Sequence, residues 1–296
     1  MSAIATIAQV IPRRRVHSSP WGDAWRRYRR NRMALVSAFI AGLTVFLAIF
    51  APLIAPYSFS YADLAATLQG PSAHHLLGTD EIGRDVLSRL IYGARTSMTV
   101  GFLVPLIGLL IGMPVGAVAG WFGRRSDFIA LRLIEASTAI PPILVGLLLI
   151  AIYGSGLFHV TLFLGIVSWV PFARLTRAQF IALREREFVT AARAIGTPPW
   201  RIMLLHILPN AAGPIILLFA LSIPAAISAE ASYSFLGLGV QDPVPSWGKM
   251  ITEGGQYIQI DPLFSLLPML CLALTTLSFN FVGDGLRDAL DPNALE

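Results

Sequence analysis

The chain has 296 residues, of which 55% are apolar and 13% are charged, and its mean hydropathy is +0.67. Soluble domains carry about 25% charged residues, so this composition excludes an ordinary soluble domain and indicates a membrane protein. The formal net charge is +5, but the basic residues cluster beside apolar runs, which argues against nucleic acid as a partner. The single cysteine, Cys271, lies within an apolar run, so no disulfide framework exists.

The N-terminal segment, residues 1–32, holds eight arginines and one acid. With Trp21, Trp25 and Tyr28 interleaved among them, it is typical of a basic segment that rests on the anionic headgroups of membrane lipids. For residues 1–18, a flexible cytoplasmic tail is the alternative. The apolar run that follows is too long for a cleavable signal peptide and lacks a small-residue cleavage site.

Charge-poor runs then predict six membrane-spanning helices, because one spanning helix needs about 20 apolar residues. The predicted spans are Met33–Pro56, Thr96–Gly123, two within 128–173 joined by a tight hairpin at Tyr153–Gly156, Ile207–Ala229, and Pro262–Gly283. Arg132 and Glu135 lie near the start of the third span, three residues apart. They could pair with each other or mark a polar pathway.

Four glycines of the second predicted span repeat at every fourth position. They are Gly108, Gly112, Gly116 and Gly120, called here the glycine seam. Such a repeat leaves one helix face without side chains, so another backbone can approach closely within the membrane. The seam could line a transport pathway or serve ordinary helix packing.

The sequence offers no catalytic motif. It contains no GxxxxGK[ST] phosphate loop, no HExxH and no GxSxG, so we expect no enzyme activity and no catalytic residue. His74 and His75, with Asp80 and Glu81, only loosely resemble a metal site. Histidines in a polar loop are far more often surface residues, and we assign no metal ligand.

The longest polar run between apolar segments is Arg174–Gly213, with six basic residues and two acids. Its apolar positions recur at helical spacing and predict one amphipathic helix that ends at Gly196-Thr197-Pro198-Pro199. These positions are Phe180, Leu183, Phe188, Ala191, Ala192 and Ile195. A second short piece, Trp200–Ile207, leads into Leu208 and Pro209. Two short helices between two spans predict a docking element on the membrane face.

The distribution of basic residues predicts the orientation. With the N-terminus inside, the cytoplasmic regions hold 17 of the 22 Lys and Arg residues, as the positive-inside rule requires. Both termini and the 174–213 run are then cytoplasmic.

The same run carries a resemblance to a known family. Permeases of ATP-binding-cassette (ABC) importers have a loop with Glu-Ala-Ala, three residues, Gly, and about nine residues before Ile-x-Leu-Pro. Here Ala191, Ala192, Gly196, Leu208 and Pro209 match that loop. Thr190 stands where the glutamate is usual, and Glu187, one turn earlier, is the nearest acid.

Three more stretches resemble the dipeptide/oligopeptide/nickel branch of this family: HLLGTDEIGRDVLSRLIYGAR from His75, EASYSFLGLGVQDPVPSWGKM from Glu230, and GDGLRDALDP from Gly283. Four stretches in the family's order cover most of the chain. The second of the three includes Glu230, Gly237 and Gly239. By resemblance, these three residues shape the external gate or contact the binding protein, whereas a solvated interfacial carboxylate is the plainer interpretation of Glu230.

The resemblance implies an all-α protein with the type I ABC importer transmembrane fold, in the bacterial inner membrane. The implied partners are two ATPase subunits, which would bind ATP and Mg, a second non-identical permease, and an extracytoplasmic solute-binding protein. The chain itself would need no cofactor. The solute would be a dipeptide, an oligopeptide, a glutathione-like peptide or nickel.

The implied organisation has four parts. They are a cytoplasmic segment 1–32, a first span with its extracytoplasmic segment 33–94, a five-helix core 95–286 with the coupling loop 174–208, and a cytoplasmic tail 287–296. An ion-gradient-driven carrier is the main alternative function. It would need acidic or histidine side chains in mid-span, and the spans offer almost none.

Overall fold

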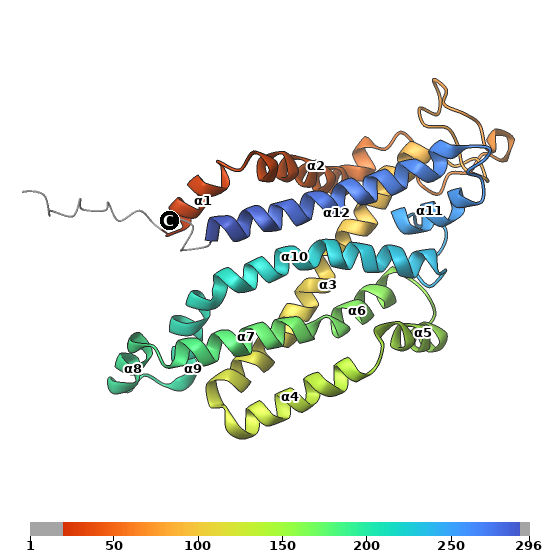
Figure 1. Cartoon of the computed structure of the whole chain (residues 1–296). Coiled ribbons are helices and arrows are strands. Elements are labelled where there is room, and N and C mark those ends of the chain that lie inside the picture. The colour runs from red at the N-terminus through yellow and green to blue at the C-terminus, as the bar shows by residue number, and fades with distance from the viewer. Residues whose placement is uncertain (1–19, 291–296) are drawn as a thin grey trace, which may run out of the picture.

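The computed structural model describes residues 20–290, so the expectations for residues 1–19 and 291–296 lie outside the described part. The described chain is an all-helical bundle (Figure 1). Its elements are α1 (Pro20–Tyr28), α2 (Arg32–Ile54), the 3-10 helix η2 (Leu64–Ala66), α3 (Val86–Phe122), α4 (Arg124–Ala139), α5 (Pro142–Tyr153), α6 (Leu157–Val167), α7 (Trp169–Arg184), α8 (Glu187–Ala194), α9 (Pro199–Ile202), the π-helical turn η3 (Met203–Ile207), α10 (Leu208–Phe235), α11 (Trp247–Gly255) and α12 (Pro262–Leu290).

Within residues 20–290, five helical segments are long and apolar enough to cross a membrane, and a bent pair, α4 and α5, supplies a sixth crossing when it counts as one span. The two helices of the pair meet at 77°. The sequence analysis treated this region as an unbroken span, which is wrong. Pro141 and Pro142 cause the break, because the residue before a proline avoids the helical region, and Ile140 and Pro141 both have extended ψ values of 124° and 126°.

The second span begins earlier than expected. Helix α3 starts at Val86, ten residues before the predicted Thr96, and runs for 37 residues. Asp85 caps it, since its carboxylate accepts a hydrogen bond from the backbone N–H of Ser88 at 2.8 Å. A search for charge-free runs could not find this start, because Arg89 lies in the first turns. Helices α10 and α12 likewise extend beyond the predicted ends.

The glycine seam of α3 packs against α7 and the residue before it. A Cβ atom at Gly108 would lie 2.2 Å from the Ser168 Oγ, and one at Gly116 would lie 2.3 Å from the Ala173 carbonyl oxygen. The backbones of the two helices are therefore in direct contact. In lipid the burial of apolar side chains does not drive helices together, so close packing at small residues such as these glycines holds the pair. Because α7 covers the seam, this face is used for packing within the chain.

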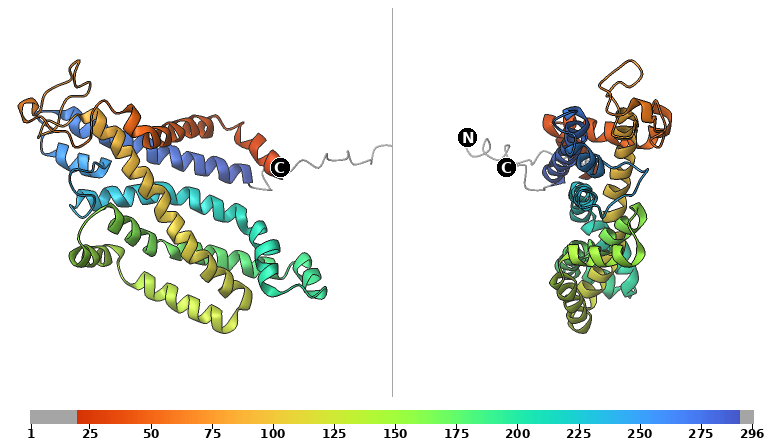
Figure 2. Two further views of the ribbon diagram at one scale, coloured as in Figure 1. Left: turned by 180° about the vertical axis from the view of Figure 1, so that it is seen from behind. Right: turned by 90° about the vertical axis from the view of Figure 1, so that its right-hand side faces the viewer.

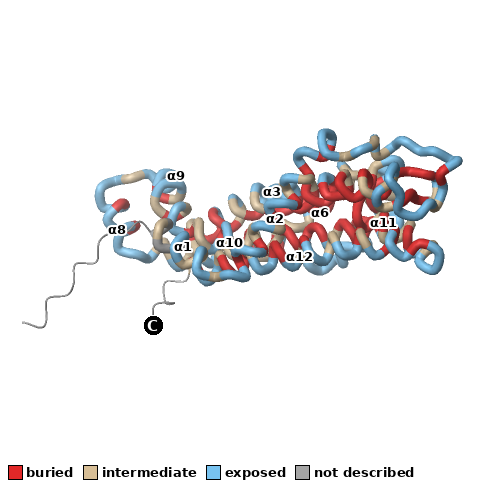
Figure 3. Tube along the Cα trace, turned by 90° about the horizontal axis from the view of Figure 1, so that it is seen from above, coloured by how far each residue is buried: buried red, intermediate tan, exposed pale blue. Residues whose placement is uncertain are grey.

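The bundle has two distinct ends. Helix α3 crosses the other helices diagonally, as Figure 2 shows from behind. One end, called here the α8 end, carries α1, the end of α12, and the projecting α8 and α9. The opposite end, called the α11 end, carries the loops of segment 55–85, α5 and α11 (Figures 1 and 3). Buried residues concentrate in the middle of the bundle and at the α11 end (Figure 3).

Candidate functional site

The polar run Arg174–Gly213 does not form the single amphipathic helix that its spacing predicts. Helix α7 ends at Arg184, and α8 begins at Glu187 after a turn in which Arg186 adopts an extended backbone. No glycine or proline marks this break. The turn instead brings Val189 of α8 against Phe180 of α7 in one buried cluster, so tertiary packing ends the helix.

Helix α8 ends as the sequence predicts, at Gly196. This glycine has a φ of +79°, which a residue with a side chain adopts only at a cost. The Thr197 N–H donates to the Ala192 carbonyl at 3.1 Å, and the Gly196 N–H donates to the Arg193 carbonyl at 3.0 Å. These two bonds form a Schellman motif and satisfy the carbonyl groups at the end of α8.

The inner face of α8 is packed against the bundle. Val189 and Ala192 are buried with Phe180, Ile202 and Ile207. The sequence analysis placed Ala191 and Ala192 together on the apolar face of one amphipathic helix. Only Ala191 is exposed, whereas Ala192 is 5% exposed and faces the chain's own core.

The outer face of the same element is apolar and uncovered. Ile195, taken in the sequence analysis as part of the packed face, is 83% exposed, and Trp200 is also exposed. Glu187 and Thr190 also lie exposed on α8. This element projects beyond the ends of the neighbouring helices (Figures 1 and 3). A rigid, apolar tip of this kind is typical of a docking surface.

The second half of the element continues without a break into a membrane-spanning helix. Helix α9, the π-helical turn η3 and α10 together form one segment from Pro199 to Phe235. Leu208 is half-buried and packs on the α8 cluster, and Pro209 follows it in the first turn of α10. Pro209 lacks a backbone N–H, and the side chain of Asn210 donates to the His206 carbonyl at 2.6 Å. Helix α9 is thus continuous with the membrane-spanning α10.

The far end of α10 carries the other predicted site residues. Glu230 is fully buried, so the interpretation as a solvated interfacial carboxylate is wrong. Its Oε1 accepts a hydrogen bond from the Ser234 hydroxyl at 2.6 Å. Gly237, with a φ of +75°, ends α10. A Cβ atom at Gly239 would lie 1.8 Å from the Ser234 Oγ, so the loop after α10 folds closely back onto the helix.

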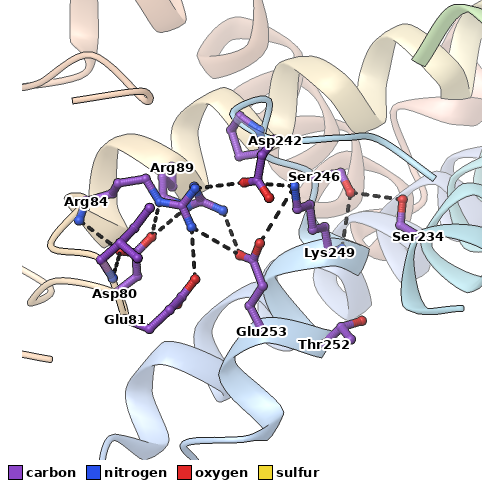
Figure 4. Close-up of polar contacts among 12 residues, drawn as sticks. Asp80, Glu81, Arg84, Arg89, Ser234, Asp242, Ser246, Lys249, Thr252 and Glu253 are labelled. Carbon is purple, nitrogen blue, oxygen red and sulfur yellow. Dashed lines mark hydrogen bonds and ion pairs between the residues drawn. The ribbon is translucent and has the colours of Figure 1, made fainter. Parts of the chain in front are cut away.

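A network of charged side chains lies beside this loop, and the sequence analysis did not assign it. Figure 4 shows its members, which are Asp80, Glu81, Arg84, Arg89, Asp242, Lys249 and Glu253. Arg89, fully buried in α3, donates to Glu253 of α11 at 2.7 Å. Arg84 Nη1 donates to Asp242 at 2.9 Å, and Lys249 Nζ lies 3.0 Å from the same carboxylate. The network therefore joins segment 55–85, α3, α11 and the loop after α10.

Burial and charge pairing act in opposite directions on these groups. Burial raises the pKa of the Glu253 carboxyl group, and the nearby Arg89 only partly offsets this. Burial alone would also raise the pKa of Asp242, but the hydrogen bonds from Lys249 and Arg84 hold it below its usual value. Asp242 is 67% exposed, so it is the member of the network most open to solvent.

Residues considered above as possible metal ligands form pairs with other side chains. His75 Nδ1 lies 3.0 Å from the Asp85 carboxylate that caps α3, and Asp80 pairs with Arg84. Within residues 20–290, no group of three or more His, Cys, Asp or Glu side chains could hold a metal ion. Arg132 pairs with Glu135 at 2.6 Å on the exposed surface of α4.

Taken together, the membrane-spanning bundle, the glycine-packed helices and the projecting α8–α9 element define a polytopic α-helical membrane protein. A solved structure of the methionine ABC transporter MetNI, in an inward-facing conformation, has the same fold in one of its chains. The TM-score is 0.57 at 19% sequence identity, and the match covers 69% of this chain and 96% of that chain. The expected type I importer fold is confirmed.

Two family models match the sequence. Residues 112–295 match the binding-protein-dependent transport system inner membrane component, and residues 19–71 match the N-terminal TM domain of oligopeptide transport permease C. The chain therefore belongs to the family of binding-protein-dependent ABC importer permeases. Proteins of this family are non-catalytic subunits of the inner membrane, and partner ATPase subunits bind the ATP.

Curated relatives match over nearly the whole chain. The dipeptide transport system permease protein DppC of Alkalihalophilus pseudofirmus is 42% identical over 274 residues, covering 93% of this chain and 90% of that protein. The oligopeptide transport system permease protein OppC of Bacillus subtilis is 39% identical with the same coverage. The glutathione transport system permease protein GsiD of Pectobacterium atrosepticum is 38% identical, covering 93% and 91%.

Proposed function

We propose that this chain forms one half of the pathway of a peptide importer, with both termini and the α8 end in the cytoplasm. Its α8–α9 element seats in an ATPase subunit. The observation that carries this is the exposed apolar tip at Ile195 and Trp200, on an element fixed to the bundle by the buried Val189 and Ala192. A tip exposed in the isolated chain but held rigidly from behind can transmit force to the helices.

Helix α10 would carry a displacement of this tip along the bundle. Because α9 continues through η3 into α10, a displacement of the tip reaches the end of α10 that holds Glu230. There the loop at Gly239 and the charged network connect α10 to α11 and α3. ATP-driven movement of two such elements would rock the two permeases between inward- and outward-open states.

The pathway face is proposed to lie on α10 near the α11 end. A hollow of about 520 Å³ is lined there by Ser228, Ser232, Phe235 and Leu236. Ser228 and Ser232 lie exposed one helical turn apart, which supplies hydroxyl groups on an otherwise apolar surface. We place the second, non-identical permease opposite this face, and an extracytoplasmic binding protein over the α11 end.

The proposed solute is a small peptide, since the relatives with 38–42% identity are named for dipeptide, oligopeptide and glutathione transport. Uptake of labelled dipeptide, tripeptide and nickel into proteoliposomes with the whole importer and its binding protein tests this. We expect uptake of one of the peptides and no competition by nickel. Uptake of nickel without competition by peptides would contradict the proposal.

The docking role is tested by substitution of Ile195 with aspartate, which places a charge on the apolar tip without touching the packed face. We expect ATPase subunits to be lost when the tagged chain is purified in mild detergent, while the second permease is retained. Leu64→Asp, at an exposed apolar position of η2 at the opposite end, is the matched control and should retain the ATPases. Retention of the ATPases by the Ile195 variant would refute the docking role.

A further inference from the structure

An apolar groove of about 390 Å³ lies at the α8 end between α1, α2 and α12. Trp25 and Tyr28 of α1 form one wall, Leu35 and Ala38 of α2 a second, and α12 a third. The volume falls within the range of about 300–1,000 Å³ that small-molecule sites occupy. None of the importer functions described above uses this groove.

The groove is held open by fixed contacts. The Tyr28 hydroxyl donates to the Ala34 carbonyl at 3.2 Å, which ties α1 to the first turn of α2. At Gly285 of α12, a Cβ atom would lie 2.4 Å from the Ala34 Cβ and 3.0 Å from the Tyr28 ring. The Trp25 and Tyr28 rings are stacked, with centroids 6.1 Å apart. Helix α1 is therefore seated on both neighbours at Tyr28, and its aromatic side faces the groove.

Two exposed arginines flank the apolar lining. The Arg29 backbone N–H donates to the Trp25 carbonyl at 3.1 Å, so Arg29 continues the groove side of α1 by one turn. Arg32 precedes Leu35 by three residues at the start of α2. Within the described part of the chain, no carboxylate pairs with the side chain of either arginine.

The nearest acids on α12 do not compensate this charge. Asp284 and Asp288 lie about half a turn around the helix from the lining residues Val282, Leu286 and Ala289, because each residue advances by about 100°. The groove thus combines an apolar slot with a positively charged rim. Such a site is complementary to a membrane ligand that has an apolar part and a negative charge.

We propose that this groove binds one anionic phospholipid, with an acyl chain between α1, α2 and α12 and the headgroup phosphate at Arg29 and Arg32. Aromatic rings with basic residues at the membrane surface favour this arrangement. The lipid would fill the gap between α1 and the bundle and so fix α1 at the end of the molecule where α8 lies. The inference does not depend on which solute is carried.

The test is native mass spectrometry of the purified full importer, titrated with phosphatidylglycerol or phosphatidylethanolamine of identical acyl chains. We expect the wild-type to retain phosphatidylglycerol preferentially. The double substitution Arg29→Gln and Arg32→Gln should weaken that retention by roughly thirtyfold, from two lost phosphate contacts. The matched control, Arg124→Gln with Arg125→Gln, removes the same charge from an exposed turn at the same end and should change little.

A second pair of variants tests the slot itself. Ala38→Trp fills the groove and should abolish retention of both lipids, whereas Leu110→Trp, at an exposed position of α3, should not. Equal retention of both lipids by the wild-type would overturn the proposal, as would equal losses in the two arginine doubles. Retention that survives Ala38→Trp would also overturn it, because the lipid would then be bound outside the groove.

Discussion

Substitution of Gly116 by alanine tests the backbone contact between α3 and α7. The added Cβ would lie 2.3 Å from the Ala173 carbonyl oxygen and 2.9 Å from the Arg177 backbone nitrogen. A comfortable carbon–oxygen contact is about 3.3 Å or longer, so α7 would have to move by roughly 1 Å. Neither neighbour is a flexible side-chain end, so we expect an overpacking cost of about 1–3 kcal/mol.

The assay is thermal unfolding of the purified importer in one detergent. At about 2–4 °C per kcal/mol for a large domain, we expect the midpoint to fall by roughly 2–12 °C. Gly213→Ala is the matched control, since it lies within α10 with no atom within 4 Å of the added Cβ. It should be neutral, or stabilise by up to about 1 kcal/mol, because alanine favours helix over glycine. Equal midpoints for the two variants would refute the packing argument.

Three other substitutions follow from the geometry. Ala192→Glu places a charge in the buried α8 cluster, so segment 185–199 should become susceptible to limited proteolysis. The control Ala191→Glu, one position away on the exposed face, should leave the segment resistant. Arg89→Met leaves the partly buried Glu253 without its closest partner, although Arg84 and Lys249 still lie 3.8 Å from that carboxylate. We therefore expect the free energy of unfolding to fall by about 1–3 kcal/mol. A double variant that also removes Glu253 should lose less than the sum of the two single losses. The pKa of the Asp242 carboxyl group is held low in the folded protein, so its ion pairs stabilise the fold above about pH 4 and stop doing so as the pH falls further. Because Asp242 is so exposed, this contribution is at most about 1 kcal/mol. The unfolding curves of the wild-type and of Asp242→Asn should therefore converge in acid.

The sequence predicts the parts of this molecule that depend on local chemistry. Apolar runs locate the spans, because a membrane requires their length whatever the packing. Gly196 marks the end of α8, since only glycine adopts its positive φ without strain. The turn at Tyr153–Gly156 separates α5 from α6 as expected. These features need no knowledge of distant residues.

The features that the sequence did not predict depend on tertiary contacts. Nothing in the sequence around Glu185 marks the break between α7 and α8, which follows from the burial of Val189. Periodicity also could not distinguish the exposed Ala191 from the buried Ala192. The charged network joins residues as far apart as Arg89 and Glu253, 164 positions along the chain, and its members appear separately as ordinary loop charges.

The most direct test of the central claim is photo-cross-linking in inner-membrane vesicles, with a photoreactive amino acid in place of Ile195 or, as the control, in place of Leu64. If the α8 end faces the cytoplasm and its tip seats in an ATPase, Ile195 yields an adduct with the ATPase subunit and Leu64 yields none. An ATPase adduct from Leu64, or none from Ile195, would contradict both the orientation and the docking role of the α8–α9 element.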